Sequence, residues 1–561
     1  MGSSHDGTAK DRLAGTAQDR AGGKGEPDRT VWASAGAVFV LLVTLVIGVS
    51  SQGAFYSRTR LHLALGLTLA VALTLPAGSR VLDALRRPPA LTGSLLAAWI
   101  LAVGAMHGTL GRGLPAAGLA MGVVAVFVVV PCLLAVDREM LASSLVWIGG
   151  LVGLTSWLGV VLHLHRWAWE GQGLWRASGA ITYPNATAAL LVSLALWSVA
   201  RMSLPSDPDR DTTTSVAFGP RWTVPALVTV MLTAAAATLS RGGALALLAG
   251  GAVLLVRSAP GTRGAAVHPV LGATVAFAGL APSLLSGEPA RPLPAVVGLA
   301  LGILIGVRAD EQVRARQNSV LTGAAAAVGL VPGEPRRRIL RAAAAGGVAV
   351  LAAGPLLLAD GFVRSLHKIT DVRVLTGPSY RVDAARAAFD RITDSPWIGT
   401  GPGEGEVSWT TSSGVSRSLM FLHDEYLQVV LELGVLTALL VLVHLLACAH
   451  SVLRAPRVPH ESLSSRRARR NAGAGGLAAI TAFAVHSALD FTWHLPALPL
   501  VVAAVLALTP SGPECMEQPE RGQESTPDDV DVRDGVTDVR EAPAKNVDKS
   551  SITHSTHPPM T

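Results

Sequence analysis

The feature that most constrains this chain is a series of fourteen apolar runs, most of which match the length of a membrane-spanning helix. About 20 apolar residues in a helix cross the hydrocarbon core of a bilayer. The sequence therefore predicts an all-α protein, a polytopic transmembrane helical bundle with about 12–14 spans. The runs lie near residues 31–49, 59–77, 91–106, 114–136, 140–162, 185–200, 222–239, 242–256, 265–284, 293–307, 340–360, 426–449, 474–491 and 495–509.

The composition excludes a soluble globular protein. Half of the residues are hydrophobic and 15% are charged, whereas about 25% of residues are charged in average globular chains. The three cysteines, Cys132, Cys448 and Cys515, lie at unrelated spacings. Neither a disulfide framework nor a zinc site follows from them, and we expect no metal and no cofactor.

The arginines predict an orientation, because cytoplasmic loops are enriched in Arg and Lys. With the N-terminus placed in the cytoplasm, the inner loops hold 22 arginines and the short outer loops hold seven. This difference predicts a multi-pass membrane protein with both termini cytoplasmic and membrane lipids as partners. Since the basic residues lie in short loops between spans, we expect no nucleic acid as a partner.

Two polar tails flank the predicted bundle and lack the apolar residues needed to bury a core. The predicted organisation is a disordered cytoplasmic tail at 1–30, transmembrane helices 1–11 within 31–360, an extracytoplasmic loop at 361–422, transmembrane helices 12–14 within 423–510, and a second disordered cytoplasmic tail at 511–561. The stretch Val320 to Val331 is apolar but too short to span a bilayer. Whether it is embedded in the membrane stays open.

The long outer loop contains an amphipathic stretch followed by a Gly/Pro-rich turn with the sequence WIGTGPGEG. Apolar side chains recur there at helical spacing. We expect a helix from Arg381 to Thr393 that lies along the membrane surface. The side chains on its apolar face are Val382, Ala385, Phe389 and Ile392.

Polar residues that are costly in lipid converge on one side of the predicted bundle. Under the predicted topology they lie at the outer ends of helices or in outer loops. The helices were placed from apolar runs alone, so this convergence is an independent observation. The residues are Arg176, Asn185, Arg241, Arg381, His423, Asp490 and His494.

Structural explanations compete for three of these positions. Arg241 lies between two closely spaced runs, where its side chain either binds a ligand or extends to lipid phosphate. The pair Pro184-Asn185 resembles a helix start, with Asn185 as its cap. His486 and Asp490 are four residues apart, the spacing of a hydrogen-bonded pair on one helix face.

The segment FLHDEYLQVVLELG carries a polar stripe at the start of an apolar run. On a helix that starts near Asp424, the side chains of Glu425, Gln428 and Glu432 fall on one face and extend about 10 Å into the membrane. Such a stripe faces a cavity or the bundle interior. His423 lies just above the stripe, where a carboxylate partner would poise the imidazole near neutral pH.

Arginines at an outer membrane surface suit a phosphate or diphosphate ligand, because guanidinium groups bind phosphates in a bidentate manner. A lipid-linked diphosphate fits this position. Arginines could stabilise charge on the leaving oxygen, while His423 or a carboxylate orients or deprotonates an acceptor hydroxyl. The expected reaction is glycosyl transfer without a metal. We assign substrate binding to Arg176, Arg381, Asn185, Asp424, Glu425, Gln428 and Glu432.

From about Arg176 to Leu508 the chain resembles the O-antigen ligase and polymerase superfamily of integral membrane glycosyltransferases. The ligase motif is a His, then Asn, Ser or Gln, nine residues, Gly, two residues, and Gly, Thr or Tyr. Here it is matched by His423, Gly434 and Thr437, whereas Asp424 departs from it. The segments SRGG (240–243), YPN (183–185) and GTGPG (399–403) are also similar to that family.

The resemblance implies an inverting transfer from an undecaprenyl-diphosphate-linked glycan donor to a glycan or lipid acceptor, in a bacterial cytoplasmic membrane. His423 and Arg241 match the family's catalytic His and essential Arg, and Arg176 matches a second candidate Arg. The choice between ligase and polymerase, the donor repeat unit, the acceptor and the oligomeric state stay open. A transporter or flippase of a lipid-linked or anionic substrate is the alternative, although no repeat or midplane charge cluster is evident.

Overall fold

The computed structural model describes residues 29–202, 222–325, 360–370, 380–411, 414–453 and 463–509. The predicted span at 340–360, the tail at 511–561, nearly all of the tail at 1–30 and half of Val320 to Val331 lie outside the described residues. Every predicted apolar run within the described residues overlaps a helix, and the protein is mostly helical.

Four helices begin with proline, whose fixed φ angle suits the first helical position: Pro88, Pro184, Pro260 and Pro292. The α-helices are α2 (Arg29–Ser50), α3 (Ser57–Thr74), α4 (Ser79–Leu85), α5 (Pro88–Met106), α6 (Leu110–Cys132), α7 (Ala135–Val161), α8 (Pro184–Met202), α10 (Thr223–Ala237), α11 (Arg241–Arg257), α12 (Pro260–Leu280), α13 (Pro292–Ala325), α15 (Asp360–Thr370), α17 (Tyr380–Asp394), α18 (Glu425–Leu453), α19 (Leu463–Ser487) and α20 (Ala497–Ala507). Short 3₁₀ turns are η1 (Gln52–Ala54), η2 (Leu75–Ala77), η3 (Gly179–Ile181), η4 (Ala281–Leu284) and η5 (Thr492–His494).

Within the described residues, eight helices are long and apolar enough to cross a membrane, which indicates a membrane protein. They are α2, α3 with η2, α5, α6, α7, α8, the end of α12 with η4, and α18. Apolar helices of 10–17 residues cover Thr223–Ala237, Pro292–Arg308 and Ala497–Ala507. The total of 12–14 spans stays a prediction.

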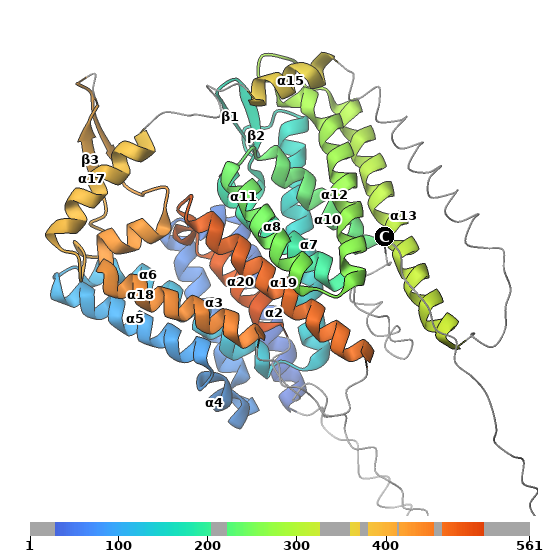
Figure 1. Cartoon of the computed structure of the whole chain (residues 1–561). Coiled ribbons are helices and arrows are strands. Elements are labelled where there is room, and N and C mark those ends of the chain that lie inside the picture. Colours follow the sequence, from blue (N-terminus) through green and yellow to red (C-terminus); the bar gives the residue numbers. More distant parts are fainter. Residues whose placement is uncertain are drawn as a thin grey trace, which may run out of the picture. The chain divides into compact units, whose positions relative to one another are not determined.

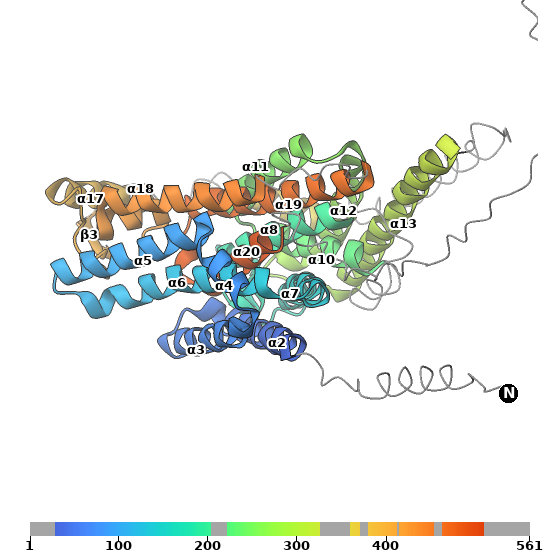
Figure 2. The same ribbon diagram turned by 90° about the horizontal axis from the view of Figure 1, so that it is seen from below.

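Helix α8 is the most buried of these eight helices and packs against α7, α10, α11, α19 and α20 (Figure 1). Its side chains are mainly Ala, Leu, Val and Ser, so that neighbouring helices can approach from all sides. A second group consists of α5, α6 and α18, which lie side by side (Figure 2). The ends of α8, α11, α18 and α19 carry the polar residues considered below.

In the part of the chain that the structure describes, two short antiparallel hairpins lie between helices. The pair β1 (Ala168–Gly171) and β2 (Leu174–Ala177) places Trp169 opposite Arg176. The pair β3 (Val407–Thr410) and β4 (Ser416–Leu419) follows α17. The sequence predicts neither hairpin, because strands of four residues carry too few alternations to stand out from a loop.

Helix α18 is broken at Gly434, where φ is 78° and ψ is 172°, whereas the sequence predicted one continuous run. The break frees backbone groups that an α-helix would otherwise pair. Residues 396–401 of the Gly-rich loop form hydrogen bonds with them. Thr400 N–H donates to Leu431 O at 2.9 Å, and Val435 N–H donates to Pro396 O at 2.9 Å. A Cβ at Gly434 would lie 2.2 Å from the Trp397 carbonyl oxygen, so this position requires glycine.

The amphipathic helix is present as α17, but a different face contacts the protein. Ala384 and Ala388 are buried against Val407 and Leu431, because small side chains let α17 approach α18 closely. Ile392 packs partly against this cluster. Val382 and Phe389 are exposed, and their placement on the membrane surface stays a prediction.

Candidate functional site

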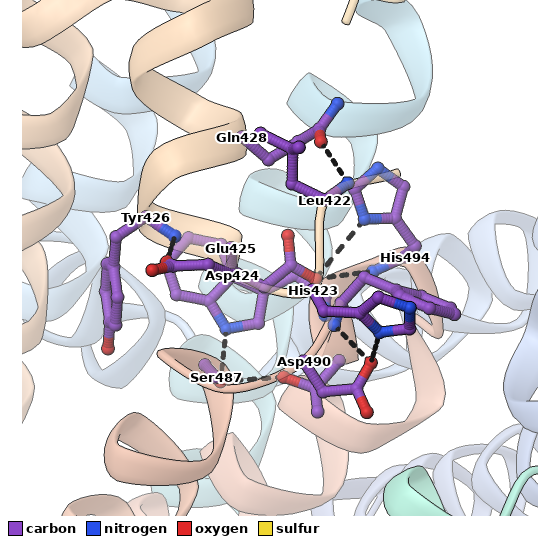
Figure 3. A network of polar contacts seen from close by, with 12 residues as sticks. Leu422, His423, Asp424, Glu425, Tyr426, Gln428, Ser487, Asp490 and His494 are labelled. Atoms are coloured by element: carbon purple, nitrogen blue, oxygen red, sulfur yellow. Dashed lines mark hydrogen bonds and ion pairs between the residues drawn. The ribbon is translucent and has the colours of Figure 1, made fainter. Parts of the chain in front are cut away.

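The centre of the candidate site is a histidine–aspartate pair formed by two loops far apart in the sequence. His423 Nδ1 lies 3.1 Å from Asp490 Oδ1 (Figure 3). His423 directly precedes the Asp424 cap of α18, and Asp490 lies between α19 and η5. The Asp490 side chain is 1% exposed and that of His423 is 15% exposed. A buried carboxylate therefore orients a partly accessible imidazole.

Asp490 accepts further hydrogen bonds that keep it ionised. The Tyr183 hydroxyl lies 2.8 and 2.7 Å from its two oxygens, the Asn185 amide donates to Oδ2, and the Phe491 backbone N–H donates to Oδ1 at 2.9 Å. Burial alone would raise the pKa of Asp490, but the hydrogen bond and charge of His423, together with the bond from Tyr183, hold it below its ordinary value. Burial, with Asp490 nearby, raises the pKa of Tyr183 well above its ordinary value, so its hydroxyl stays a donor.

Three arginines surround this pair. Arg176, on β2, donates from Nε to the Thr238 carbonyl and from Nη2 to Asn185 Oδ1, each at 2.8 Å. Burial lowers the pKa of Arg176, and the positive charges of Arg381 and Arg241 lower it further, against the effect of Tyr183 and Asp490. Arg176 is therefore within electrostatic reach of both Arg381 and Arg241, and an anion bound beside it would offset this repulsion.

Arg241 is the first residue of α11. The Ser240 side chain caps this helix by accepting from Gly243 N–H at 3.1 Å, and the preceding Leu239 has φ of 52°, as a tight turn requires. The Arg241 side chain is exposed, and its charge adds to the positive end of the helix dipole. Arg381, on α17, donates to the Leu489 carbonyl at 3.3 Å.

The polar stripe on α18 faces the protein interior and binds neighbouring loops. Glu425 Oε1, on a side chain that is 1% exposed, accepts from Trp493 N–H and lies 3.3 Å from His494 Nδ1. Gln428 accepts from Leu422 N–H at 2.7 Å and donates to Glu432. Glu432 Oε2 accepts from Gly403 N–H at 2.8 Å. Glu425 and Gln428 therefore hold the loops that carry His494 and His423, and Glu432 holds the Gly-rich loop.

Asp424 caps α18. Its Oδ1 accepts from Tyr426 N–H at 3.0 Å and from Leu427 N–H at 3.1 Å. Burial raises the pKa of Asp424, although these backbone bonds act in the opposite direction. Asp, Asn and Ser are all favoured as helix caps, so this departure from the ligase motif preserves the local structure.

Two structural explanations from the sequence are wrong. Asn185 is not the cap of α8, because it is the second residue of that helix and its side chain binds Arg176 and Asp490. His486 does not pair with Asp490, because α19 ends at Ser487. His486 is fully buried, and no hydrogen-bond partner for its ring occurs in the part of the chain that the structure describes.

The structure brings Arg176, Asn185, Arg381 and His423 together around Asp490, and Arg241 lies within electrostatic reach of Arg176. Sequence reasoning noticed Asp490 at the outer face but did not select it, and it missed Tyr183. Their signals were the position of Asp490 beyond an apolar run and the Tyr in YPN. Among the described residues, no group of three His, Cys, Asp or Glu side chains could hold a metal ion.

The fold and the site define a helical membrane protein with a His–Asp pair beside an arginine cluster. Comparisons with protein-family models and with curated proteins find no match to the chain.

Proposed function

We propose that this protein is a membrane glycosyltransferase that resembles the O-antigen ligases and polymerases. It moves a glycan from an undecaprenyl-diphosphate carrier to a sugar or lipid acceptor, with inversion and without a metal. The observation that supports this function most directly is the His423–Asp490 pair beside Arg176, Arg241 and Arg381. A general base and an anion-binding group are the two parts that displacement of a diphosphate requires.

In the proposed reaction His423 is the general base. Its Nδ1–H donates a hydrogen bond to Asp490, which stays ionised, and this leaves Nε2 to accept the proton of the acceptor hydroxyl. The acceptor oxygen attacks the anomeric carbon as the bond from that carbon to the diphosphate oxygen breaks. The arginines stabilise the charge that develops on the diphosphate, and a single displacement inverts the anomeric centre.

An apolar groove beside the site suits the hydrocarbon tail of the donor. It lies between α18 and α19, has a volume of about 490 Å³ and is lined mainly by aliphatic side chains. Its lining includes Tyr426, two residues after the cap of α18, and Ala484, whose carbonyl accepts from the Tyr426 hydroxyl at 3.0 Å. A lipid bound there would have its diphosphate near Arg381, which contacts Leu489.

The proposed location is the outer face of a bacterial cytoplasmic membrane, with both termini in the cytoplasm. Single cysteines at Ser416, an exposed position on β4, and Ser79, an exposed position at the start of α4, test this topology. An impermeant thiol reagent should label intact cells at Ser416→Cys and not at Ser79→Cys. The reverse pattern would place the site on the wrong side for this reaction.

A flippase for the same lipid is the second candidate, because the break in α18 resembles the discontinuous helices of transporters. Purified protein in vesicles with a lipid-diphosphate glycan separates the two functions. Transfer predicts free undecaprenyl diphosphate and a glycosylated acceptor. Movement of intact lipid between leaflets, without diphosphate release, would instead support a flippase and contradict the proposed transferase.

A further inference from the structure

A series of Phe and Tyr rings lies beside the candidate base. Aromatic residues make up only 5% of the chain, with ten Phe, four Tyr and twelve Trp. Ring contacts form a continuous series from the loop between α2 and α3 to the loop between α19 and η5. We define the aromatic wall as Phe55, Tyr56, Phe421 and Phe491.

The wall is held by edge and stacking contacts between its rings. The Phe55 and Phe421 centroids are 6.2 Å apart, and those of Phe421 and Phe491 are 5.9 Å apart. Tyr56 extends the series from Phe55 at 5.5 Å. Phe55, Phe421 and Phe491 are partly exposed and Tyr56 is 58% exposed. The wall therefore presents accessible ring surface, although Phe491 also packs against the core.

The wall adjoins the catalytic pair on the side of His423. The His423 ring is 5.4 Å from Phe491. The arginines contact other groups: Arg176 binds Asn185 and Thr238, and Arg381 binds the Leu489 carbonyl. Contacts therefore run from the arginines through Asp490 to His423 and then into the wall.

The arginines and the aromatic wall, at the two ends of this series of contacts, suit two different parts of the reactants: the donor diphosphate and the acceptor sugar. The diphosphate requires cations, and Arg176 and Arg381 lie on the Asp490 side. Arg60, 6.0 Å from the Phe55 ring centroid, already donates to the Ala54 and His494 carbonyls. An acceptor sugar presents hydroxyl groups at its edge and C–H groups on its ring faces, and aromatic rings offer a flat apolar surface with a negative face for such C–H groups. We infer that the aromatic wall binds the acceptor saccharide and presents its hydroxyl to His423; this inference rests on the proposed function.

Phe421 is the central test position, because it contacts Phe55, Phe491 and His494. Phe421→Leu removes the ring while keeping an apolar side chain, and Phe421→Tyr keeps the ring. We expect Phe421→Leu to raise the KM for the acceptor about fivefold to tenfold, the scale of an aromatic contact. The donor KM should stay unchanged, and Phe421→Tyr should restore the acceptor KM. The matched control is Phe389→Leu on α17, where the ring is 58% exposed and outside the wall.

A binding measurement separates this inference from the proposed reaction. Neutral methyl glycosides are mixed with the wild-type protein, and saturation transfer from the protein to the sugar C–H protons is recorded by NMR. Wild type and Phe389→Leu should give transfer, whereas Phe421→Leu and the surface variant Tyr56→Leu should give less. Equal transfer in all variants, or an increase of the donor KM instead of the acceptor KM, would overturn the inference. If the wild-type protein binds the glycosides but catalyses no glycosyl transfer, the proposed function is refuted while saccharide binding by the wall stands.

Discussion

Replacement of Asp490 by Asn tests whether the buried carboxylate makes His423 a base. The substitution keeps the shape of the side chain but removes its charge and one acceptor. Asp490 accepts from the Tyr183 hydroxyl, the Asn185 amide and the Phe491 N–H, and it pairs with His423 Nδ1. Since Asn carries an NH₂ group, at least one of these donors would face another donor.

The expected loss follows from the role of the pair. General acid–base assistance contributes about 10²–10⁴-fold, and an imidazole in the wrong tautomer loses most of it. Asp490→Asn should therefore lower kcat by about 10²–10⁴-fold. Hydrogen bonds to charged groups are worth about 1.5–3 kcal/mol each, so the free energy of unfolding should also fall by a few kcal/mol. We therefore expect a lower Tm in detergent as well.

The assay measures release of undecaprenyl diphosphate from a saturating lipid-linked donor. The matched control is Asp83→Asn, because Asp83 is an exposed carboxylate on α4 whose ion pair with Arg86 spans 4.0 Å. A folded Asp490→Asn protein that turns over at the wild-type rate would show that Asp490 is structural and would remove the general base from the mechanism.

Three further predictions follow from individual groups of the site. Arg241→Lys keeps the charge but loses the bidentate donor geometry, so activity should drop about tenfold to a hundredfold, and near-normal turnover would indicate contact with lipid instead. Although burial lowers the pKa of His494, the Glu425 charge and hydrogen bond raise it above its ordinary value; the stability from this pair should be complete below about pH 6.5 and be lost as the pH rises through the raised pKa. His494→Gln should abolish this alkaline loss in Tm, and persistence of the loss would assign it to another group. Gly434→Ala places a Cβ against a carbonyl in a positive-φ backbone and should cost at least about 1–3 kcal/mol, whereas an unchanged Tm would show that α18 can straighten.

The helices could be predicted from the sequence because each long apolar run must satisfy its own backbone hydrogen bonds in lipid. The polar residues at the predicted outer face could also be selected from the sequence, since buried or interfacial charges in such a chain are few. His423 and Arg241 were selected on these grounds and on the family motif. Their activity as catalytic groups stays a prediction.

The pairing of His423 with Asp490 could not be predicted from the sequence. The apolar run at 474–491 continues past Ser487, where α19 ends, so sequence periodicity placed Asp490 on a helix with His486. In the structure Asp490 lies in a loop and pairs with His423, 67 residues away. The break at Gly434 was equally hidden, because its partners lie in a loop whose conformation depends on three glycines with positive φ: Gly399, Gly401 and Gly403.

The break in α18 has a consequence for how the protein is made. The backbone groups freed around Gly434 are paired by residues 396–401, which leave the ribosome before α18. In hydrocarbon those groups would have no water to replace this pairing. The first nine residues of α18 therefore reach their final position only together with residues 396–401. We expect insertion of this helix and docking of the loop to form one step of biogenesis.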